Sequence, residues 1–401
     1  MARILFTWEL GGGMGHVAPY LPLIEGLRER GHEVGFALRN LQFAELSLGS
    51  RGIPFFQAPA MQGRFADNIN EPYTFAQILH NVGYADVDLI TALARAWREL
   101  YRCFKPDLIV CDHSPTALLA ARDFPVRKAV VGPGFFLPPD TGLPPVLRKS
   151  APAPAQEFLL QEEQRIVGNI NRVLGVLHAT PIERIAQMYA ADAQILLTLR
   201  ELDHYLERQA DTQVEYWGIG RSGMGEAPQW PALEGKRIYA YLKPFKTLPS
   251  LLERLVQLGQ PTLIYAPEVE AGLKLRFASR AVQFCASPLD LERTAQECDL
   301  AITNATHATA LTFLLAGKPQ LMLPLYLEQR LVGDNVERLG AGLNAPALHP
   351  VGMSSKLDAL LTDPRYTQGA QSFAARYAGF DPDEMEQRLI QRIDALAVNH
   401  A

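Results

Sequence analysis

The sequence predicts an α/β fold made of two doubly wound parallel-sheet domains that face each other across a cleft. Short apolar runs alternate with helical patterns in both halves of the chain, which implies right-handed crossovers between parallel strands. A glycine-rich loop directly follows the first apolar run, as in many α/β ligand sites. A stretch rich in glycine and proline, residues 218–235, separates the two halves.

The length of the chain supports this division. With 401 residues it is too long for one ordinary core, and two domains of roughly 200 residues are expected. We place an N-terminal domain at residues 1–217, a linker at 218–235 and a C-terminal domain at 236–380. Residues 381–401 contain an amphipathic stretch, which we expect to form a helix that packs back on the first domain.

The strands are predicted from short apolar runs, beginning with Arg3–Trp8. From Val17 the apolar residues recur on one face until Gly31, which predicts a helix with a glycine stop. A long, mostly helical region is expected from Gln156 to about Met188. The other strands expected are residues 32–38, 108–111, 128–131 and 193–199 in the first half, and 237–242, 262–265, 281–284, 300–303 and 320–323 in the second.

The loop after the first strand carries four glycines, Gly11, Gly12, Gly13 and Gly15, followed by His16. Glycines let the backbone turn tightly and approach a ligand closely. A nicotinamide-binding loop would read G-x-G-x-x-G and would be followed by an acidic residue at the end of the second strand, and both are missing here. The sequence leaves two roles open for His16: a general base kept neutral by a helix N-terminus, or a first-turn residue that contacts nearby backbone.

A second informative segment runs from Leu300 to Gly342. A strand ends at Thr303, and a helix is expected to begin near residues 306–309, where free amides and the helix dipole suit a diphosphate. Glu328-Gln329 follows the next strand, where a carboxylate and an amide can bind adjacent sugar hydroxyls. The alternative for this pair is a capping role at the start of the next helix.

Composition excludes several other classes of protein. The net charge of −5 argues against a non-specific nucleic-acid binder. Four cysteines without C-x-x-C spacing fit a reducing cytoplasm, and no run approaches the ~20 apolar residues of a membrane span. Asp86-Val87-Asp88 matches a metal-binding D-x-D pattern but lies in a helical stretch, so we expect no metal site. A cytoplasmic protein, monomeric or homodimeric, is expected.

Three collinear motifs resemble the nucleotide-sugar-dependent glycosyltransferases of GT-B fold, the family that contains macrolide and flavonoid glycosyltransferases and UDP-glycosyltransferases. The first is Gly15-His16-Val17-Ala18-Pro19 with the later Arg30-Gly31-His32-Glu33-Val34. The second is the segment 105–112, KPDLIVCD, and the third is the segment 300–342. The resemblance covers nearly the whole chain and implies two Rossmann-like domains, a nucleoside-diphosphate sugar donor as co-substrate, a small-molecule acceptor and no further cofactor.

Carried over residue by residue, the resemblance implies that His16 is the general base of an inverting, metal-independent hexose transfer. It implies that Asp112 orients the imidazole and stabilises its protonated form, as in other carboxylate–histidine pairs. An alternative for Asp112 is a helix N-cap, because Ser114-Pro115 follow it. The acceptor is expected to be small and apolar.

The donor loop departs from the family pattern. Asn304 stands where most relatives have histidine, and Thr306 and Ala308 stand where they have glycine. Lys243 follows the strand 237–242 and can supply a compensating point charge, although it can also be a solvated lysine. The residues expected to bind the donor are Gly13, Gly15, Lys243, Asn304, Thr306, His307, Ala308, Thr309, Glu328 and Gln329.

For the acceptor, the segments 62–74 and 142–188 are expected to line the site, with Phe65, Tyr73 and Phe135 as contact residues. Two alternatives remain open beside the transferase of small acceptors. A lipid-linked cell-envelope glycosyltransferase would dock peripherally on a membrane, for which residues 146–165 offer apolar and basic side chains. A non-catalytic protein that binds sugar nucleotides is the other alternative.

Overall fold

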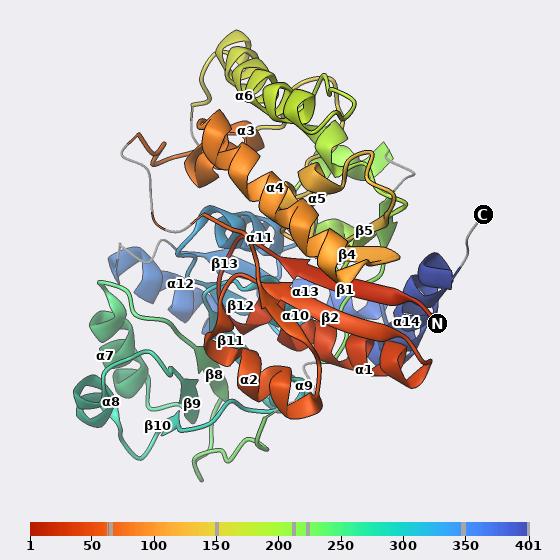
Figure 1. The fold of residues 1–401 in the computed structure, drawn as a ribbon. Coiled ribbons are helices and arrows are strands. Elements are labelled where there is room, and N and C mark those ends of the chain that lie inside the picture. The colour runs from red at the N-terminus through yellow and green to blue at the C-terminus, as the bar shows by residue number, and fades with distance from the viewer. Residues whose placement is uncertain are drawn as a thin grey trace. The chain divides into compact units, whose positions relative to one another are not determined.

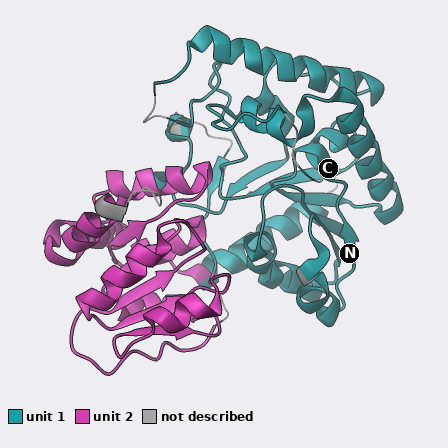
Figure 2. Ribbon diagram, turned by 90° about the vertical axis from the view of Figure 1, so that its left-hand side faces the viewer, with its two compact units in different colours: residues 1–220, 383–401 teal, residues 221–382 magenta. Residues whose placement is uncertain are grey.

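The chain divides into two compact units, residues 1–220 with 383–401 (unit 1) and residues 221–382 (unit 2), coloured separately in Figure 2. The computed structural model describes residues 1–61, 63, 67–148, 152–210, 214–221, 225–345 and 350–398. Each unit contains one parallel sheet, so the predicted pair of doubly wound parallel-sheet domains is confirmed. The first passage between the units follows Gly220, and the chain returns to unit 1 at Asp383.

The sheet of unit 1 has seven strands in the order β3-β2-β1-β4-β5-β6-β7. Figure 1 labels β2, β1, β4 and β5 of this sheet. Its central strands pair β1 with β4 in a register that sets Trp8 beside Asp112. The strands are β1 Arg3–Trp8, β2 Glu33–Leu38, β3 Phe55–Gln57, β4 Leu108–Asp112, β5 Arg127–Gly132, β6 Ala193–Leu196 and β7 Val214–Tyr216.

Helices cover both faces of this sheet, as the buried apolar runs of its central strands require. One face packs against α4, α5 and α6, where Leu5 and Ile109 of the strands join Trp97 of α4 in one core. The opposite face carries α1, on which α14 packs. The two helices are so close that a Cβ placed on Gly26 of α1 would lie 2.5 Å from Ile390 of α14. The helices are α1 Leu21–Glu29, α2 Ala44–Ser47, α3 Phe75–Leu79, α4 Val87–Phe104, α5 Pro115–Ala121, α6 Gln156–Val176 and α14 Pro382–Val398.

The sheet of unit 2 has six strands in the order β10-β9-β8-β11-β12-β13. Its strands are β8 Ile238–Tyr241, β9 Thr262–Tyr265, β10 Val282–Cys285, β11 Leu300–Thr303, β12 Gln320–Met322 and β13 Gly342–Asn344. One face packs against α7, α8 and α12, and the other against α9 and α10. The helices are α7 Leu248–Leu258, α8 Ala271–Phe277, α9 Leu291–Glu297, α10 His307–Leu315, α11 Leu327–Arg338, α12 Pro350–Thr362 and α13 Pro364–Arg376.

The long helical region predicted for residues 156–188 is shorter in the structure. Helix α6 ends at Val176, and a 3-10 segment, Ile185–Tyr189, follows after a break at His178, whose φ is 54°. A left-handed residue cannot continue an α-helix, which explains the break. None of the helices in the described part of the chain is both long and apolar enough to cross a membrane.

Candidate functional site

Each sheet has a point where the strand order reverses, and open parallel sheets bind ligands there, beyond the carboxyl ends of the strands. In unit 1 this point lies between β1 and β4, and in unit 2 between β8 and β11. We call them the first and the second switch point. His16 follows β1 and Asp112 ends β4, whereas Lys243 follows β8 and Asn304 follows β11.

His16 does not stand at the start of an α-helix, so this part of the sequence interpretation is wrong. The residues after the glycine loop form two 3-10 turns, Met14–His16 and Ala18–Tyr20, and α1 begins only at Leu21. Pro22 explains the difference, because proline has no N–H and is accepted only in the first turn of an α-helix. The N-terminus of α1 therefore lies five residues after His16 in the chain.

His16 and Asp112 form a direct pair at the first switch point. The Nδ1 atom of His16 lies 2.8 Å from Oδ2 of Asp112, whose side chain is 5% exposed. Because a carboxylate can only accept, the pair fixes the proton of neutral His16 on Nδ1 and leaves Nε2 as the basic nitrogen. The buried Tyr20 hydroxyl donates to the carbonyl of Val131, and burial together with the nearby Asp112 carboxylate raises the pKa of Tyr20 well above its ordinary value.

Aromatic rings hold the imidazole of His16 in place. The indole of Trp8 stacks on it with a centroid distance of 5.1 Å and an interplanar angle of 12°. The imidazole of His113 also lies near it, with 6.3 Å between the two ring centroids. His113 is buried and has a φ of 43°. Burial, helped by His16, lowers the pKa of His113 well below its ordinary value, so this second imidazole is neutral. Neither Trp8 nor His113 is marked as a site residue by a motif in the sequence.

The glycine loop contacts His16 through Gly11. A Cβ on Gly11 would lie 2.5 Å from Nε2 of His16, and the φ of Gly11 is +87°. Gly13 has the same φ but nothing within 4 Å of its Cβ position, and Gly15 likewise faces open space. Gly13 and Gly15 are the glycines that the motif predicts at the donor site, whereas the glycine that approaches the imidazole is Gly11.

A buried carboxylate connects the two loops of the first switch point. Glu9, the residue after β1, is 3% exposed and accepts from the amides of Thr116 at 2.8 Å and Ala117 at 3.2 Å at the start of α5. Burial raises the pKa of Glu9 to about 7. The N-cap residue of α5 is Ser114. Asp112 is therefore not the N-cap residue of α5. Ser114 occupies the N-cap position, and Glu9 accepts the hydrogen bonds from the first amides of the helix.

At the second switch point Asn304 is part of the fold. Its Oδ1 accepts from the amide of Lys243 at 2.8 Å, and its Nδ2 donates to the carbonyl of Leu323 at 2.8 Å. The side chain is 2% exposed and joins the ends of β8, β11 and β12. Both polar atoms of the amide therefore have partners within unit 2, which the sequence analysis did not foresee.

Lys243 is half-buried, and its ammonium points toward a carboxylate. Its Nζ lies 3.8 Å from Oε1 of Glu268 in the loop after β9, and the two side chains are 30% and 60% exposed. The side chain is thus neither deeply buried nor fully solvated. It can offer its charge to an anion beyond the end of β8 at the expense of a weak surface pair.

The turn into α10 keeps a left-handed residue without glycine. Ala305 is buried with a φ of 56°, and its amide donates to Oγ1 of Thr303 at 3.1 Å. Thr306 is the N-cap residue, but its side chain makes no capping hydrogen bond. The remaining predicted donor residues of this turn differ in exposure: His307 and Thr309 are buried, and Ala308 is exposed.

Glu328 and Gln329 lie in the first turn of α11, after the N-cap residue Tyr326. The Oε1 atom of Gln329 accepts from the amide of Leu325 at 2.8 Å, which is the capping role that the sequence left open. Glu328 is half-buried. Asp86 of the D-x-D pattern caps α4 by accepting from the amide of Leu89. Within the described ranges, no three His, Cys, Asp or Glu side chains come together as a metal site.

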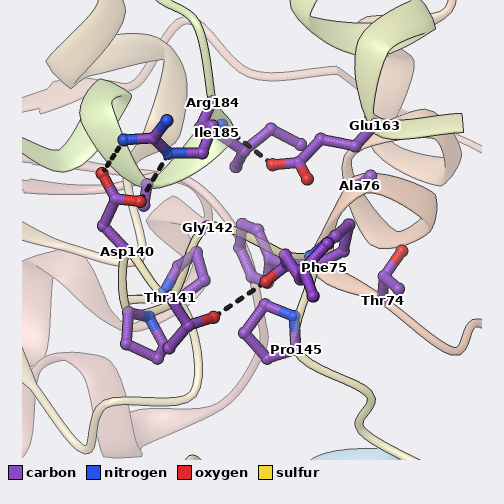
Figure 3. A pocket seen from close by; sticks show the side chains of 15 residues that line it. Thr74, Phe75, Ala76, Asp140, Thr141, Gly142, Pro145, Glu163, Arg184 and Ile185 are labelled. Carbon is purple, nitrogen blue, oxygen red and sulfur yellow. Dashed lines mark hydrogen bonds and ion pairs between the residues drawn. The ribbon is translucent and has the colours of Figure 1, made fainter. Parts of the chain in front are cut away.

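The expected acceptor residues fall in unit 1. Phe65 lies outside the described residues. Tyr73 precedes α3, and its hydroxyl donates to the carbonyl of Pro152 at 3.2 Å. Phe135, in the loop after β5, is 7% exposed and packs edge-on against His113 and Phe75 at 6.4 Å each. Phe135 thus links the surroundings of His16 to a pocket beside α3 and α6 (Figure 3).

The expected membrane-docking patch has few exposed apolar members. Leu147 and Leu159 are buried, whereas Phe158 is 47% exposed. Arg148 is largely covered and donates to the carbonyl of Pro72. Lys149 lies outside the described residues. The segment 146–165 therefore gives little support to a membrane-docking surface.

Comparisons with known proteins extend the fold assignment. No family model matches the chain, and no curated protein matches its sequence. Among solved structures it is similar to CalG4, the calicheamicin glycosyltransferase, with a TM-score of 0.72 and 16% identity over 100% of this chain and 99% of that one. The glycotransferase of kitacinnamycin gives a TM-score of 0.70 and 16% identity, covering 99% of both chains. The Streptomyces sp. SF2575 glycosyltransferase SsfS6, complexed with thymidine diphosphate, gives 0.65 and 19%, covering 98% of this chain and 100% of that one.

These similarities span each partner almost from end to end, and they agree with the two parallel sheets described above. At such identities a structural likeness establishes the fold. With its two Rossmann-like units, the chain has the GT-B, UDP-glycosyltransferase-like fold.

Proposed function

We propose that this protein is an inverting, metal-independent glycosyltransferase. In this proposal it moves a hexose from a UDP- or dTDP-sugar to a small, apolar acceptor in the cytoplasm, without a further cofactor. The observation that carries the proposal is the His16–Asp112 pair, 2.8 Å apart at the first switch point of a chain with the GT-B fold. The structural neighbours named above, one of them complexed with thymidine diphosphate, support the choice of donor.

His16 would act through Nε2, because Nδ1 is committed to Asp112. Nε2 takes the proton of the acceptor hydroxyl as its oxygen forms a bond to the anomeric carbon of the sugar. The bond from that carbon to the diphosphate breaks at the same time, so the nucleoside diphosphate leaves with the electron pair. Asp112 stabilises the resulting imidazolium, and attack opposite to the leaving group inverts the anomeric centre.

Unit 2 would bind the nucleoside diphosphate. The amides at the start of α10, a nine-residue helix, and the ammonium of Lys243 offer positive charge to phosphate groups. Because both polar atoms of the Asn304 amide have partners within unit 2, this amide holds the loops and would help the donor only indirectly. The Oε1 atom of Gln329 holds the start of α11 by accepting from the amide of Leu325.

The experiment is a thermal-shift panel with UDP, dTDP, GDP, ADP and NADH, followed by turnover with the matching sugar nucleotide. A ligand at ~100 times its dissociation constant stabilises the native state by roughly 2.7 kcal/mol. His16→Ala should reduce transfer at least ~10²-fold, the usual loss for a general base, and leave nucleotide affinity nearly unchanged. Transfer at the wild-type rate by this variant would remove His16 from the mechanism. His178, an exposed histidine of unit 1, offers the matched control as His178→Asn.

A second candidate function is sugar-nucleotide binding without catalysis. It is favoured by the donor loop, where Asn304 serves the fold and the turn into α10 has alanine and threonine instead of glycine. Nucleotide binding without turnover on any acceptor, unchanged by His16→Ala, would select this second function. Absence of a shift with every diphosphate would contradict both.

A further inference from the structure

Unit 2 contains a cavity of about 240 Å³ at the amino ends of its strands, opposite to the second switch point. It lies between the starts of β8, β11 and β12 and the carboxyl ends of α10 and α12, and α13 forms another wall. The exposed residues Lys236 and Gln371 mark its opening to solvent. A cavity of about 150 Å³ holds a benzene molecule, so this one has room for a ring that carries a polar group.

The inner wall of the cavity is apolar. Leu300, the first residue of β11, is 1% exposed, and Leu360, in the last turn of α12, is 2% exposed. Pro319, which precedes β12, is also buried and lines the cavity. A wholly polar ligand would leave this wall in contact with water, whereas an apolar ring would remove it from water at a gain in free energy. The wall therefore favours a ligand with an apolar part.

Two lysines form the polar side of the cavity, and each ammonium binds the last turn of a helix. The Nζ atom of Lys236 donates to the carbonyl of Leu361 in α12 at 2.6 Å, and that of Lys318 donates to the carbonyl of Gln296 in α9 at 3.0 Å. Among the described residues, neither lysine has a carboxylate within ion-pair distance. One N–H of each ammonium thus satisfies a helix end, and the others remain for a ligand.

The topology of the sheet brings the two lysines to one place. Lys236 comes just before β8 and Lys318 just before β12, and these strands flank β11 on its two sides. Because neighbouring strands lie about 4.8 Å apart, both lysines reach the start of β11. There Asp299 turns one oxygen to the backbone, accepting from the amide of Arg237 at 2.8 Å. Two lysines and one aspartate give the described lining a net positive charge.

Neutral donors add to this charge on the wall that α13 forms. Thr367 and Gln371 lie one turn apart on α13, and both line the cavity. Within the part of the chain that the structure describes, neither side chain has a hydrogen-bond partner. Hydroxyl, amide and ammonium N–H and O–H groups therefore outnumber the acceptors around the cavity. The complementary ligand is rich in acceptors and negatively charged.

We propose that this cavity binds a small carboxylic acid with an apolar ring. The ring would pack on Leu300 and Leu360, and the carboxylate would accept from Lys236 and Lys318 in charge-assisted hydrogen bonds. The proposal goes beyond glycosyl transfer, because helix α10 separates this cavity from the proposed diphosphate site. The helix begins after Thr306 at that site and ends before Gly317 at the cavity. The ligand is therefore neither the sugar donor nor the acceptor.

The test titrates benzoate, benzamide and inorganic phosphate into the full-length protein by calorimetry. Benzoate and benzamide share a ring and differ in charge, whereas phosphate has charge and no ring. We expect benzoate to bind about tenfold more tightly than benzamide, as for hydrogen bonds to a charged group, and more tightly than phosphate. Equal affinity for benzoate and benzamide, equal affinity for benzoate and phosphate, or no binding of benzoate would each overturn the proposal.

Two variants locate the carboxylate. Lys236→Met and Lys318→Met keep the length of the side chain and remove its charge, so each should weaken benzoate binding about threefold or more. Benzamide binding should change less. The matched control is Lys274→Met, a half-buried lysine of α8 outside the lining, which should bind benzoate like the wild type. Wild-type benzoate affinity in both cavity variants would overturn the proposal.

A competition experiment separates this cavity from the proposed donor site. Benzoate affinity should stay the same when UDP or dTDP is present in excess, because the two sites lie at opposite ends of α10. Displacement of benzoate by either nucleotide would place it in the donor site and overturn the proposal. Nucleotide binding is measured without benzoate as well, so a failure of this proposal is distinguishable from a failure of the proposed transferase function.

Discussion

The two switch points have the same topology and fasten their loops with different chemistry. At the first, the ends of the central strands are joined by ionisable side chains, His16 with Asp112, and Glu9 binds the start of α5. At the second, one neutral amide, Asn304, joins the strand ends through backbone atoms. An imidazole–carboxylate pair can exchange a proton with a ligand, whereas an amide cannot. The difference agrees with the proposal that His16 transfers a proton and that Asn304 holds the loops of unit 2.

The largest expected effect is the loss of stability of unit 2 in Asn304→Ala. The substitution leaves the amide of Lys243 and the carbonyl of Leu323 without their partner. Two lost bonds with partial burial should destabilise unit 2 by roughly 2–5 kcal/mol. Hydrogen-exchange protection of β8 and β11 should fall, while β1 and β4 keep theirs. Asn304→Asp separates the two bonds, since a carboxylate still accepts from Lys243 and opposes the Leu323 carbonyl. Unchanged protection in both variants would show that the amide does not fasten the strands.

The second prediction concerns the pH dependence of the stability of unit 1. Burial raises the pKa of Glu9 from 4.5 to about 7, so the folded state holds this proton more tightly than the unfolded state. The stabilisation is therefore full at low pH and is lost as the pH rises between about 4.5 and 7, by roughly 3 kcal/mol at most. Glu9→Gln, which can still accept from both amides, should remove this dependence. Hydrogen exchange of α5, corrected for its intrinsic pH dependence, is the measurement; an identical pH profile in the variant would contradict it.

The third prediction compares two glycines of one loop. Gly11 and Gly13 both have a φ of +87°, so alanine at either position should cost about 1–2 kcal/mol. A Cβ would strike Nε2 of His16 only from Gly11. We expect Gly11→Ala to lower turnover tenfold or more and Gly13→Ala to lower it much less. Equal turnover of the two variants would mean that the position of the imidazole does not depend on the close approach of Gly11.

The smallest effect is expected at the second switch point, from Lys243 and Glu268. Lys243→Ala should weaken UDP or dTDP binding about two- to fivefold, the range of a half-exposed charge contact, and affect the free nucleoside less. Glu268→Gln removes the carboxylate that competes for the ammonium, so it should strengthen diphosphate binding slightly. Calorimetric titration of both variants with UDP or dTDP tests whether their affinities change in opposite directions. Unchanged affinity in both variants would mean that Lys243 does not contact the diphosphate.

The sequence could predict the strands that are short, buried apolar runs. β1, β9 and β11 match the predicted residues, because each is buried and lies between clear turn signals. The short strands β3, β7 and β13 were missed. Each has three residues and is mostly half-buried at a sheet edge, so no apolar run marks it. Strands of this kind exist because a neighbouring strand offers them hydrogen bonds.

The candidate site was predictable where a motif names a residue and not where tertiary contacts decide its partners. His16 and Asp112 lie together as the resemblance implied, although their catalytic roles remain a proposal. The engagement of Asn304 by Leu323 depends on a strand nineteen residues later in the chain. Glu163 looks like an ordinary surface residue of an amphipathic helix, and it is buried because the segment with Ile185 covers it. No local pattern carries that information.

The return of the chain to unit 1 has a consequence for synthesis of the protein on the ribosome. Helix α14 completes unit 1 by packing on Gly26, pairing Asp394 with His32 at 2.9 Å and accepting from Arg127 through the carbonyl of Leu396. Unit 2 is continuous in sequence, so its residues emerge together. Because translation adds about 5–20 residues per second, roughly 10–40 s pass between synthesis of the first 220 residues and synthesis of the helix that covers α1. The unit that begins synthesis first is thus the last to be completed, and the surface of α1 that contacts α14 stays uncovered during that time.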